Sequence, residues 1–320
     1  MQEAVFIRQN LKKWQDMENM VGDTVFTTPD ELVKAYNELT SDLAFAQTQY
    51  PASPVTAYLN DLALSLHRDL YRHKHTPWSR VVRFWTHDIP LSVYDARWCL
   101  LLSLAIFVVF IIIGMLSTIG DPNFPRVILG DDYVDMTLSN IEAGNPMAVY
   151  AQGDQVSSFL GITFNNVLVS FIIYVMGIFT SFGTGYYLMT NGIMVGAFVT
   201  FFIVRSLFVK SILAIMLHGT LELSAIVISG GAGIMLGNGW LFPGTYGRVQ
   251  SFLRAAQRSV RVIISTIPIF IIAGFIEGFF TRYTDIGDGL RLLVICASAL
   301  FIIYYYILLP IKRHREASGK

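Results

Sequence analysis

Long apolar runs separated by short polar stretches dominate residues 99–310 of the chain. A helix that crosses a hydrocarbon core of about 30 Å needs about 20 mostly apolar residues. The runs that meet this need are 99–119, 160–182, 186–204, 207–236, 260–280 and 291–310. We therefore expect an all-α protein, a polytopic transmembrane helical bundle of about six spans over residues 99–310. The run 207–236 exceeds one upright crossing, so we expect a helix that tilts, protrudes or breaks at His218–Gly219.

Residues 1–76 show apolar positions at helical spacing without a long apolar run, which predicts an N-terminal soluble helical domain. A capping box predicts the start of its second helix, with Thr28 as N-cap, Pro29 at N1 and Glu31 at N3. Ser53–Pro54 predicts the start of a third helix by the same logic. We expect this domain to lie in the cytoplasm.

Two further segments predict contact with the membrane surface. Residues 77–98 mix tryptophan with arginine, which is typical of an interface, and we expect a juxtamembrane helix broken at Pro90. Residues 245–260 have the pattern of a cytoplasmic amphipathic helix lying against anionic lipid. The arginines expected to face this lipid are Arg254, Arg258 and Arg261. A basic cytoplasmic tail, 311–320, follows the last span.

The composition agrees with a membrane protein. Hydrophobic residues make up 53% of the chain and charged residues only 14%, whereas soluble proteins have about 25% charged residues. The formal net charge is zero, so no overall field attracts nucleic acid. Nucleic acid is therefore not an expected partner, and the lipid bilayer is.

The distribution of charge predicts how the spans are oriented. Residues 120–159 hold six acidic residues against Arg126 alone, while 237–260 and 311–320 are basic. By the positive-inside rule, 120–159 is an external acidic loop, and both termini are cytoplasmic. Both termini on one side require an even number of crossings, in agreement with six.

Polar side chains inside the spans are the candidates for function. A charge at the centre of a span costs about 2.5–3.5 kcal/mol on insertion scales, so such a residue should face the bundle interior. His218 and Glu222 are four residues apart and share one helix face. We expect an intramembrane polar site composed of His218, Glu222, Glu277, Asn165, Asn166 and Asn191.

This polar site has several interpretations. It can be a proton relay, an ion path or a metal site, or only an interhelical hydrogen bond that locks the bundle. Catalytic zinc needs three protein ligands and a water, and His218 is the only histidine in a span. The sequence also lacks H-E-x-x-H. We therefore expect no metal, no cofactor and no catalytic residue.

Small residues recur at the spacing that lets membrane helices approach closely. Gly192/Gly196, Gly233/Gly237 and Gly274/Gly278 are G-x-x-x-G pairs. The full set of expected packing glycines is Gly192, Gly196, Gly230, Gly231, Gly233, Gly237, Gly274 and Gly278. We favour packing within one chain over a dimer face, and a homo-oligomer is the alternative.

Together these features resemble the stage II sporulation protein M family (SpoIIM-like, also called DUF95), in its long form with an N-terminal cytoplasmic helical domain. The resemblance covers the whole chain and includes residues 41–62, 66–73 and 84–98. Its most specific part is LHGTLELSA (217–225), followed by glycines. Leu217 departs from the family pattern, which often has proline there, so a local kink is not assured.

The resemblance implies a multi-pass protein of the bacterial plasma (inner) membrane. The family's namesake belongs to a complex that recruits peptidoglycan hydrolases during engulfment, so the resemblance implies other membrane or envelope proteins as partners. We therefore expect a non-enzymatic membrane scaffold or assembly protein linked to cell-envelope complexes. The alternative is a proton- or ion-coupled transporter or channel that uses the His/Glu site. An intramembrane metal-dependent hydrolase ranks third.

Overall fold

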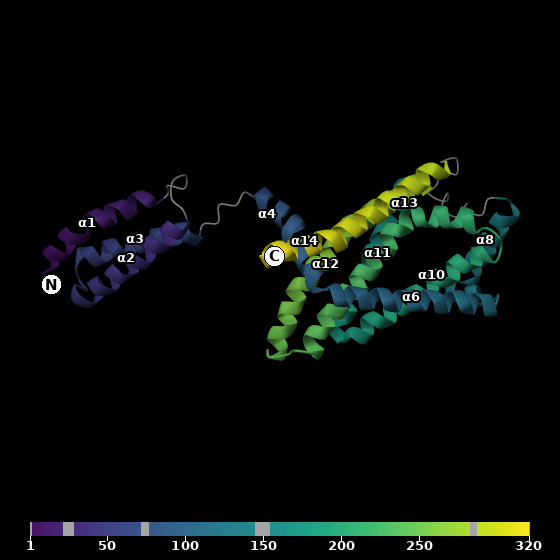
Figure 1. Ribbon diagram of the computed structural model, residues 1–320, viewed down its shortest axis with the longest axis horizontal. Coiled ribbons are helices and arrows are strands. Elements are labelled where there is room, and N and C mark those ends of the chain that lie inside the picture. Colours follow the sequence, from purple (N-terminus) through teal and green to yellow (C-terminus); the bar gives the residue numbers. More distant parts are fainter. Residues whose placement is uncertain (1, 22–28, 72–76, 145–153, 282–286, 320) are drawn as a thin grey trace. The chain divides into compact units, whose positions relative to one another are not determined.

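The structure is a computed structural model, shown in Figure 1, that describes residues 2–21, 29–71, 77–144, 154–281 and 287–319. These residues contain helices and no strand, which confirms the predicted all-α class. The chain divides into two compact units, Met1–Arg80 and Val81–Lys320. Each unit has its own apolar core, so the two are described separately.

The N-terminal unit packs α1 (Glu3–Met20), α2 (Pro29–Gln49) and α3 (Pro54–Tyr71) around one core. Its largest buried side chain is Trp14, whose Nε1 donates to Asp42 Oδ2 at 2.9 Å. Ser53 Oγ accepts from the Val55 amide at 3.2 Å and so caps the start of α3. The capping box predicted at Thr28 lies outside the described residues.

The second unit contains the membrane spans. Six helical stretches among the described residues are long and apolar enough to cross a membrane, which confirms the predicted number. They are built on α6 (Arg97–Gly120), α9 (Gln155–Val175), α10 (Ser181–Ile203), α11 (Phe208–Leu241), α12 (Arg248–Phe275) and α13 (Asp288–Ile303). Three of them continue into a short turn of 3-10 or π-helix: η3 (Met176–Phe179) after α9, η4 (Ile276–Thr281) after α12, and η5 (Tyr304–Leu308) after α13. A last α-helix, α14 (Leu309–Ala317), follows η5.

Helix α11 is the central helix of this bundle. In its most apolar stretch 56% of the residues are buried, against 17% in α6. It runs unbroken for 34 residues, so the expected alternative of a break at His218–Gly219 is wrong. At about 1.5 Å per residue it is about 51 Å long, well beyond a hydrocarbon core of about 30 Å. The helix is therefore long enough to tilt within the membrane or to protrude from it.

The extra length of α11 forms a hairpin with the start of α12 (Figure 1). The rings of Trp240 and Phe252 meet edge to face at 6.4 Å. The helix predicted at 245–260 begins at Arg248 as α12 and continues directly into the fifth span. Packing against α11 carries this segment straight into the bundle.

The three arginines expected to face lipid lie at the start of α12 and have different surroundings. Arg254 lies over the ring of Tyr246, 3.9 Å from its centre. Arg258 pairs with Asp95 at 3.3 Å, and Arg261 is exposed. Two of the three therefore contact protein groups, and lipid contact stays a prediction.

The juxtamembrane segment consists of α4 (Pro77–Arg83), the π-helical turn η1 (Phe84–Asp88) and α5 (Ile89–Asp95). The break predicted at Pro90 is wrong, because the backbone stays helical from the π-helical turn η1 into α5, with Pro90 just after that turn. Tyr305 Oη donates to the Trp85 carbonyl at 2.7 Å, and Arg313 Nε donates to the Thr86 carbonyl at 2.9 Å. Tyr305 and Arg313, at the end of the last span, therefore fix the juxtamembrane segment in place.

The external loop predicted at 120–159 contains two helices, α7 (Phe124–Leu129) and α8 (Asp131–Glu142). Its acidic residues lie partly on the outer face of α8, where Arg126 binds Asp131 at 3.0 Å and Asp135 at 2.6 Å. This guanidinium holds the pKa of the Asp135 carboxyl below its usual range. The inner face buries Val134 against Phe201 and Phe202. Residues 124–129 and 131–142 are thus helical and pack on the spans, where the sequence predicts a loop.

All eight expected packing glycines stand against another helix. Gly192 and Gly196 bring α10 to α6, where a Cβ on Gly196 would overlap the Ile111 carbonyl. Gly230, Gly231, Gly233 and Gly237 do the same for α11 against α6, α9 and α10, and Gly274 and Gly278 for α12 and η4 against α9. One partner was not foreseen: a Cβ on Gly177 would overlap the Gly233 carbonyl. Glycine thus permits backbone contact throughout the bundle.

Candidate intramembrane polar site

Three ionisable side chains meet inside the bundle. His218 and Glu222 lie on α11, and Glu277 lies on the π-helical turn η4. One donor atom from each lies within 4.8 Å of the other two, and His218 Nε2 is 3.9 Å from Glu277 Oε2. His218 is only 5% exposed. We call these three residues the polar centre.

Hydrogen bonds from neighbouring helices fix the side chains of this centre. Asn166 of α9 donates through Nδ2 to Glu222 Oε1 at 2.6 Å. Thr281 Oγ1 donates to the Ile276 carbonyl and lies 3.3 Å from His218 Nδ1. Because the threonine hydrogen is already used, we assign the proton of this contact to His218 Nδ1. His218 Nε2 then faces Glu277.

Local structure explains how Glu277 reaches α11. In a π-helical turn each backbone hydrogen bond reaches one residue farther along the chain than in an α-helix, so the turn shifts the direction of the side chains that follow. A Cβ on Gly274 would overlap Thr163, and a Cβ on Gly278 would lie tightly against Phe159. These glycines bring the end of the fifth span against α9. Together the turn and the glycines place Glu277 beside the face of α11 that carries His218.

Two of the six residues expected in this site lie elsewhere, which corrects the prediction. Asn165 is exposed on α9, because it is turned about 100° around the helix from its neighbour Asn166. Asn191 donates through Nδ2 to the Tyr187 carbonyl of its own helix at 2.8 Å. The other four, His218, Glu222, Glu277 and Asn166, come together.

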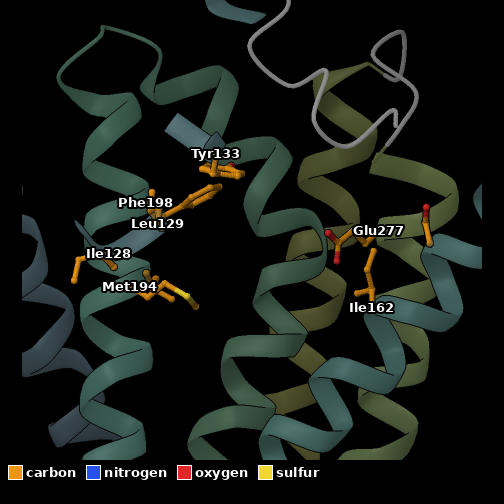
Figure 2. Close-up of a pocket in the computed structure, with 10 residues that line it drawn as sticks. Ile128, Leu129, Tyr133, Ile162, Met194, Phe198 and Glu277 are labelled. Atoms are coloured by element: carbon orange, nitrogen blue, oxygen red, sulfur yellow. The ribbon is translucent and has the colours of Figure 1, made fainter. Parts of the chain in front are cut away.

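A cavity of about 510 Å³ reaches the polar centre from the end of the bundle that carries α7 and α8. Figure 2 shows Glu277 and Ile162 on one side, with Met194, Phe198 and Tyr133 on the other. Glu277 is the only carboxylate among the described lining residues. Sequence reasoning missed this cavity, whose walls come from α7, α8, α9, α10 and η4. The helical spacing of apolar residues in α8 was its only signal.

A line of polar side chains continues from the polar centre along α9, and sequence reasoning missed it as well. Asn166 is followed at helical spacing by Ser170 and Tyr174, on the same face. The Ser170 and Ser229 hydroxyls share a hydrogen bond, and Tyr174 Oη lies 3.1 Å from Ser259 Oγ. All four side chains are buried. We call this set, from Asn166 to Ser259, the polar line.

Comparison with known proteins places the site in a family. The sequence profile of stage II sporulation protein M matches residues 103–282, more than half of the chain. The chain belongs to the stage II sporulation protein M family. The matched region includes the whole polar centre and most of the spans. Residues 4–72 match a domain of unknown function (DUF8413).

Relatives add little about the activity of this family member. An uncharacterized protein of Methanocaldococcus jannaschii is 26% identical over 132 residues, which are 40% of this chain and 58% of the relative. The match thus spans less than two thirds of that relative. No solved structure matches the chain. The resemblance seen in the sequence is confirmed, and it supports a multi-pass membrane protein of this family.

The hydrogen bond from Asn166 to Glu222 yields a stability prediction. Asn166→Leu removes the donor from a buried carboxyl group, and we expect a loss of about 1–3 kcal/mol in the free energy of unfolding. Thermal unfolding of the purified protein in detergent measures this loss as a lower midpoint. Asn165→Leu is the matched control, because Asn165 is exposed. Equal midpoints for the two variants would contradict the assigned contact.

Proposed function

We propose that the chain is a membrane transporter or channel for a small cation, with the polar centre as its binding site. The observation that supports this most is the meeting of His218, Glu222 and Glu277 inside the spans at the end of a cavity. Ionisable side chains are expensive in a membrane and commonly mark ion pathways. An interhelical hydrogen bond that only stabilises the bundle would need fewer ionisable side chains and no cavity beside them.

The arrangement around the polar centre supports a path through the membrane. On the cavity side, Asp131 and Asp132 in the first turn of α8 add negative charge, which raises the local concentration of cations. On the other side, the polar line leads between α9, α11 and α12 toward Ser259. Ser259 directly follows Arg258, which pairs with the juxtamembrane Asp95. Polar groups therefore extend from the cavity toward the opposite end of the bundle.

Flux through reconstituted liposomes tests this function. We expect the wild-type protein to carry protons or a divalent cation down a gradient, as reported by a trapped dye for each. Glu222→Gln keeps the shape of the side chain and removes its charge, so we expect flux to fall at least tenfold. Glu142→Gln is the matched control, because Glu142 is exposed at the end of α8. Wild-type flux in the Glu222→Gln variant would refute a path through the polar centre.

A membrane scaffold linked to cell-envelope complexes is the second candidate, supported by the N-terminal unit. This unit has its own core and carries exposed apolar side chains, among them Leu64 at 54% and Val33 at 42%. Such side chains suit a partner protein of the same membrane or envelope. The proposal is that this unit docks a partner while the spans anchor it.

Purification from the native membrane tests the scaffold. We expect a defined set of partners to co-purify in mild detergent, and mass spectrometry identifies them. A chain without residues 1–76 should lose those partners and still insert its spans, because the second unit has a separate core. Glu222→Gln should leave the partners bound. Retention of every partner by the shortened chain would refute docking through this unit.

We further propose that the protein lies in the bacterial plasma membrane with both termini in the cytoplasm, since 120–159 is acidic and the tail is basic. Single cysteines at Asn123 or Ser318, in a chain whose own cysteines are replaced, test this orientation. Both positions are exposed. A membrane-impermeant maleimide should label Asn123→Cys in intact cells, and Ser318→Cys only after lysis. The reverse pattern would invert the topology.

A further inference from the structure

We propose that His218, Glu222 and Glu277 bind one first-row divalent transition cation, with Zn²⁺ as the best fit and Mn²⁺ as the next. This inference rests on the proposed function, because it names the cation class of the same site. Binding is measured separately from flux, so either can fail alone. The sequence groups the three residues in one polar site, and the fold brings Glu277, 55 positions beyond Glu222, within ligand distance of α11.

The donor atoms have the right type and spacing. One imidazole nitrogen and two carboxylate oxygens are ordinary zinc ligands, at about 2.0–2.2 Å from the metal. Tetrahedral ligands at that radius lie about 3.4 Å apart. His218 Nε2 and Glu277 Oε2 are already 3.9 Å apart, and all three donor atoms lie within 4.8 Å of one another. Small side-chain rotations close the remaining distance.

Neighbouring groups prepare the ligands for a metal. Histidine ligands of metals usually donate their other ring nitrogen to a polar group, which fixes the tautomer and the ring direction. Thr281 Oγ1 is placed to accept from His218 Nδ1, which directs Nε2 toward Glu277. Asn166 holds one oxygen of Glu222 at 2.6 Å and leaves the other as a ligand. Thr281 thus orients the His218 side chain, and Asn166 orients the Glu222 side chain.

Charge also favours a divalent ion. Glu222 and Glu277 lie close together where the dielectric constant is low, so two carboxylates there repel each other strongly. In the part of the chain that the structure describes, no lysine or arginine forms an ion pair with either of them. One divalent cation between two carboxylates and a neutral imidazole leaves no net charge.

The cavity gives the ion an entry path and room for further ligands. It has a volume of about 510 Å³, and Glu277 forms part of its wall. Water can therefore complete the coordination from that side. Mg²⁺ prefers six oxygen ligands and gives up its water reluctantly, whereas an imidazole suits zinc and its neighbours. We therefore expect Mg²⁺ to bind at least tenfold more weakly than Zn²⁺.

Metal binding by the full chain, purified without a polyhistidine tag and treated with a chelator, tests the inference. Isothermal titration with ZnCl₂ should show one equivalent bound by the wild-type protein. His218→Gln and Glu277→Gln should each weaken binding at least tenfold, and Glu142→Gln should bind like wild type. X-ray absorption at the zinc edge of the wild-type protein should show one imidazole with oxygen ligands. This measurement needs no variant, so it is unaffected if a variant misfolds.

The outcomes separate this inference from the proposed function. No zinc bound by wild type, or zinc bound with two or more imidazoles or with sulfur, overturns the metal site. Proton flux that Glu222→Gln abolishes would then still support transport. One bound zinc with a single imidazole, but no flux of any cation, supports the metal site and refutes transport. Equal binding by His218→Gln, Glu277→Gln and wild type also overturns the site.

Discussion

A carboxyl group buried in a membrane must find a hydrogen-bond donor or a counter-charge, and Glu222 meets this requirement through Asn166 on α9. Together with the hydrogen bond between Ser170 and Ser229, this contact holds α9 against α11. Helix α11 is the central helix, and the other spans pack around it. The same contact leaves Glu222 beside His218, whose side chain reaches the end of the fifth span. The polar centre is therefore both an ordering constraint and the candidate site.

Glycine makes so close an approach achievable. The hydrophobic effect does not drive helices together within lipid, so contacts between backbones and a few hydrogen bonds must hold them. The carbonyls of Gly233 and Ile111 lie where a Cβ on Gly177 or Gly196 would be. Ser103 adds a hydrogen bond of 2.7 Å to the Val227 carbonyl, which holds α6 against α11. Packing of this kind lets α11 carry ionisable residues without exposing them to lipid.

The sequence predicts the spans well because lipid imposes one simple rule, length and apolarity, on each of them. It also identifies Glu222 and Glu277 as interior residues, because lipid would not accept them. It cannot tell Asn165 from Asn166, since a span that is apolar on all sides shows no face. The packing of α8 on the bundle depends on distant residues such as Phe201, so the sequence alone predicts a loop where the structure has a helix. The turn that redirects Glu277 is tertiary in origin and has no local signal.

The two ends of the proposed path differ, which limits how it can work. The cavity side is open and reaches Glu277 directly. The other side ends at the contact between Tyr174 and Ser259, next to the Arg258–Asp95 ion pair. On the transport proposal, a cation would enter from the α8 end, and its exit would require α9 to move relative to α12. The hydrogen bonds that resist such a movement are each worth only about 0.6 kcal/mol in membrane proteins.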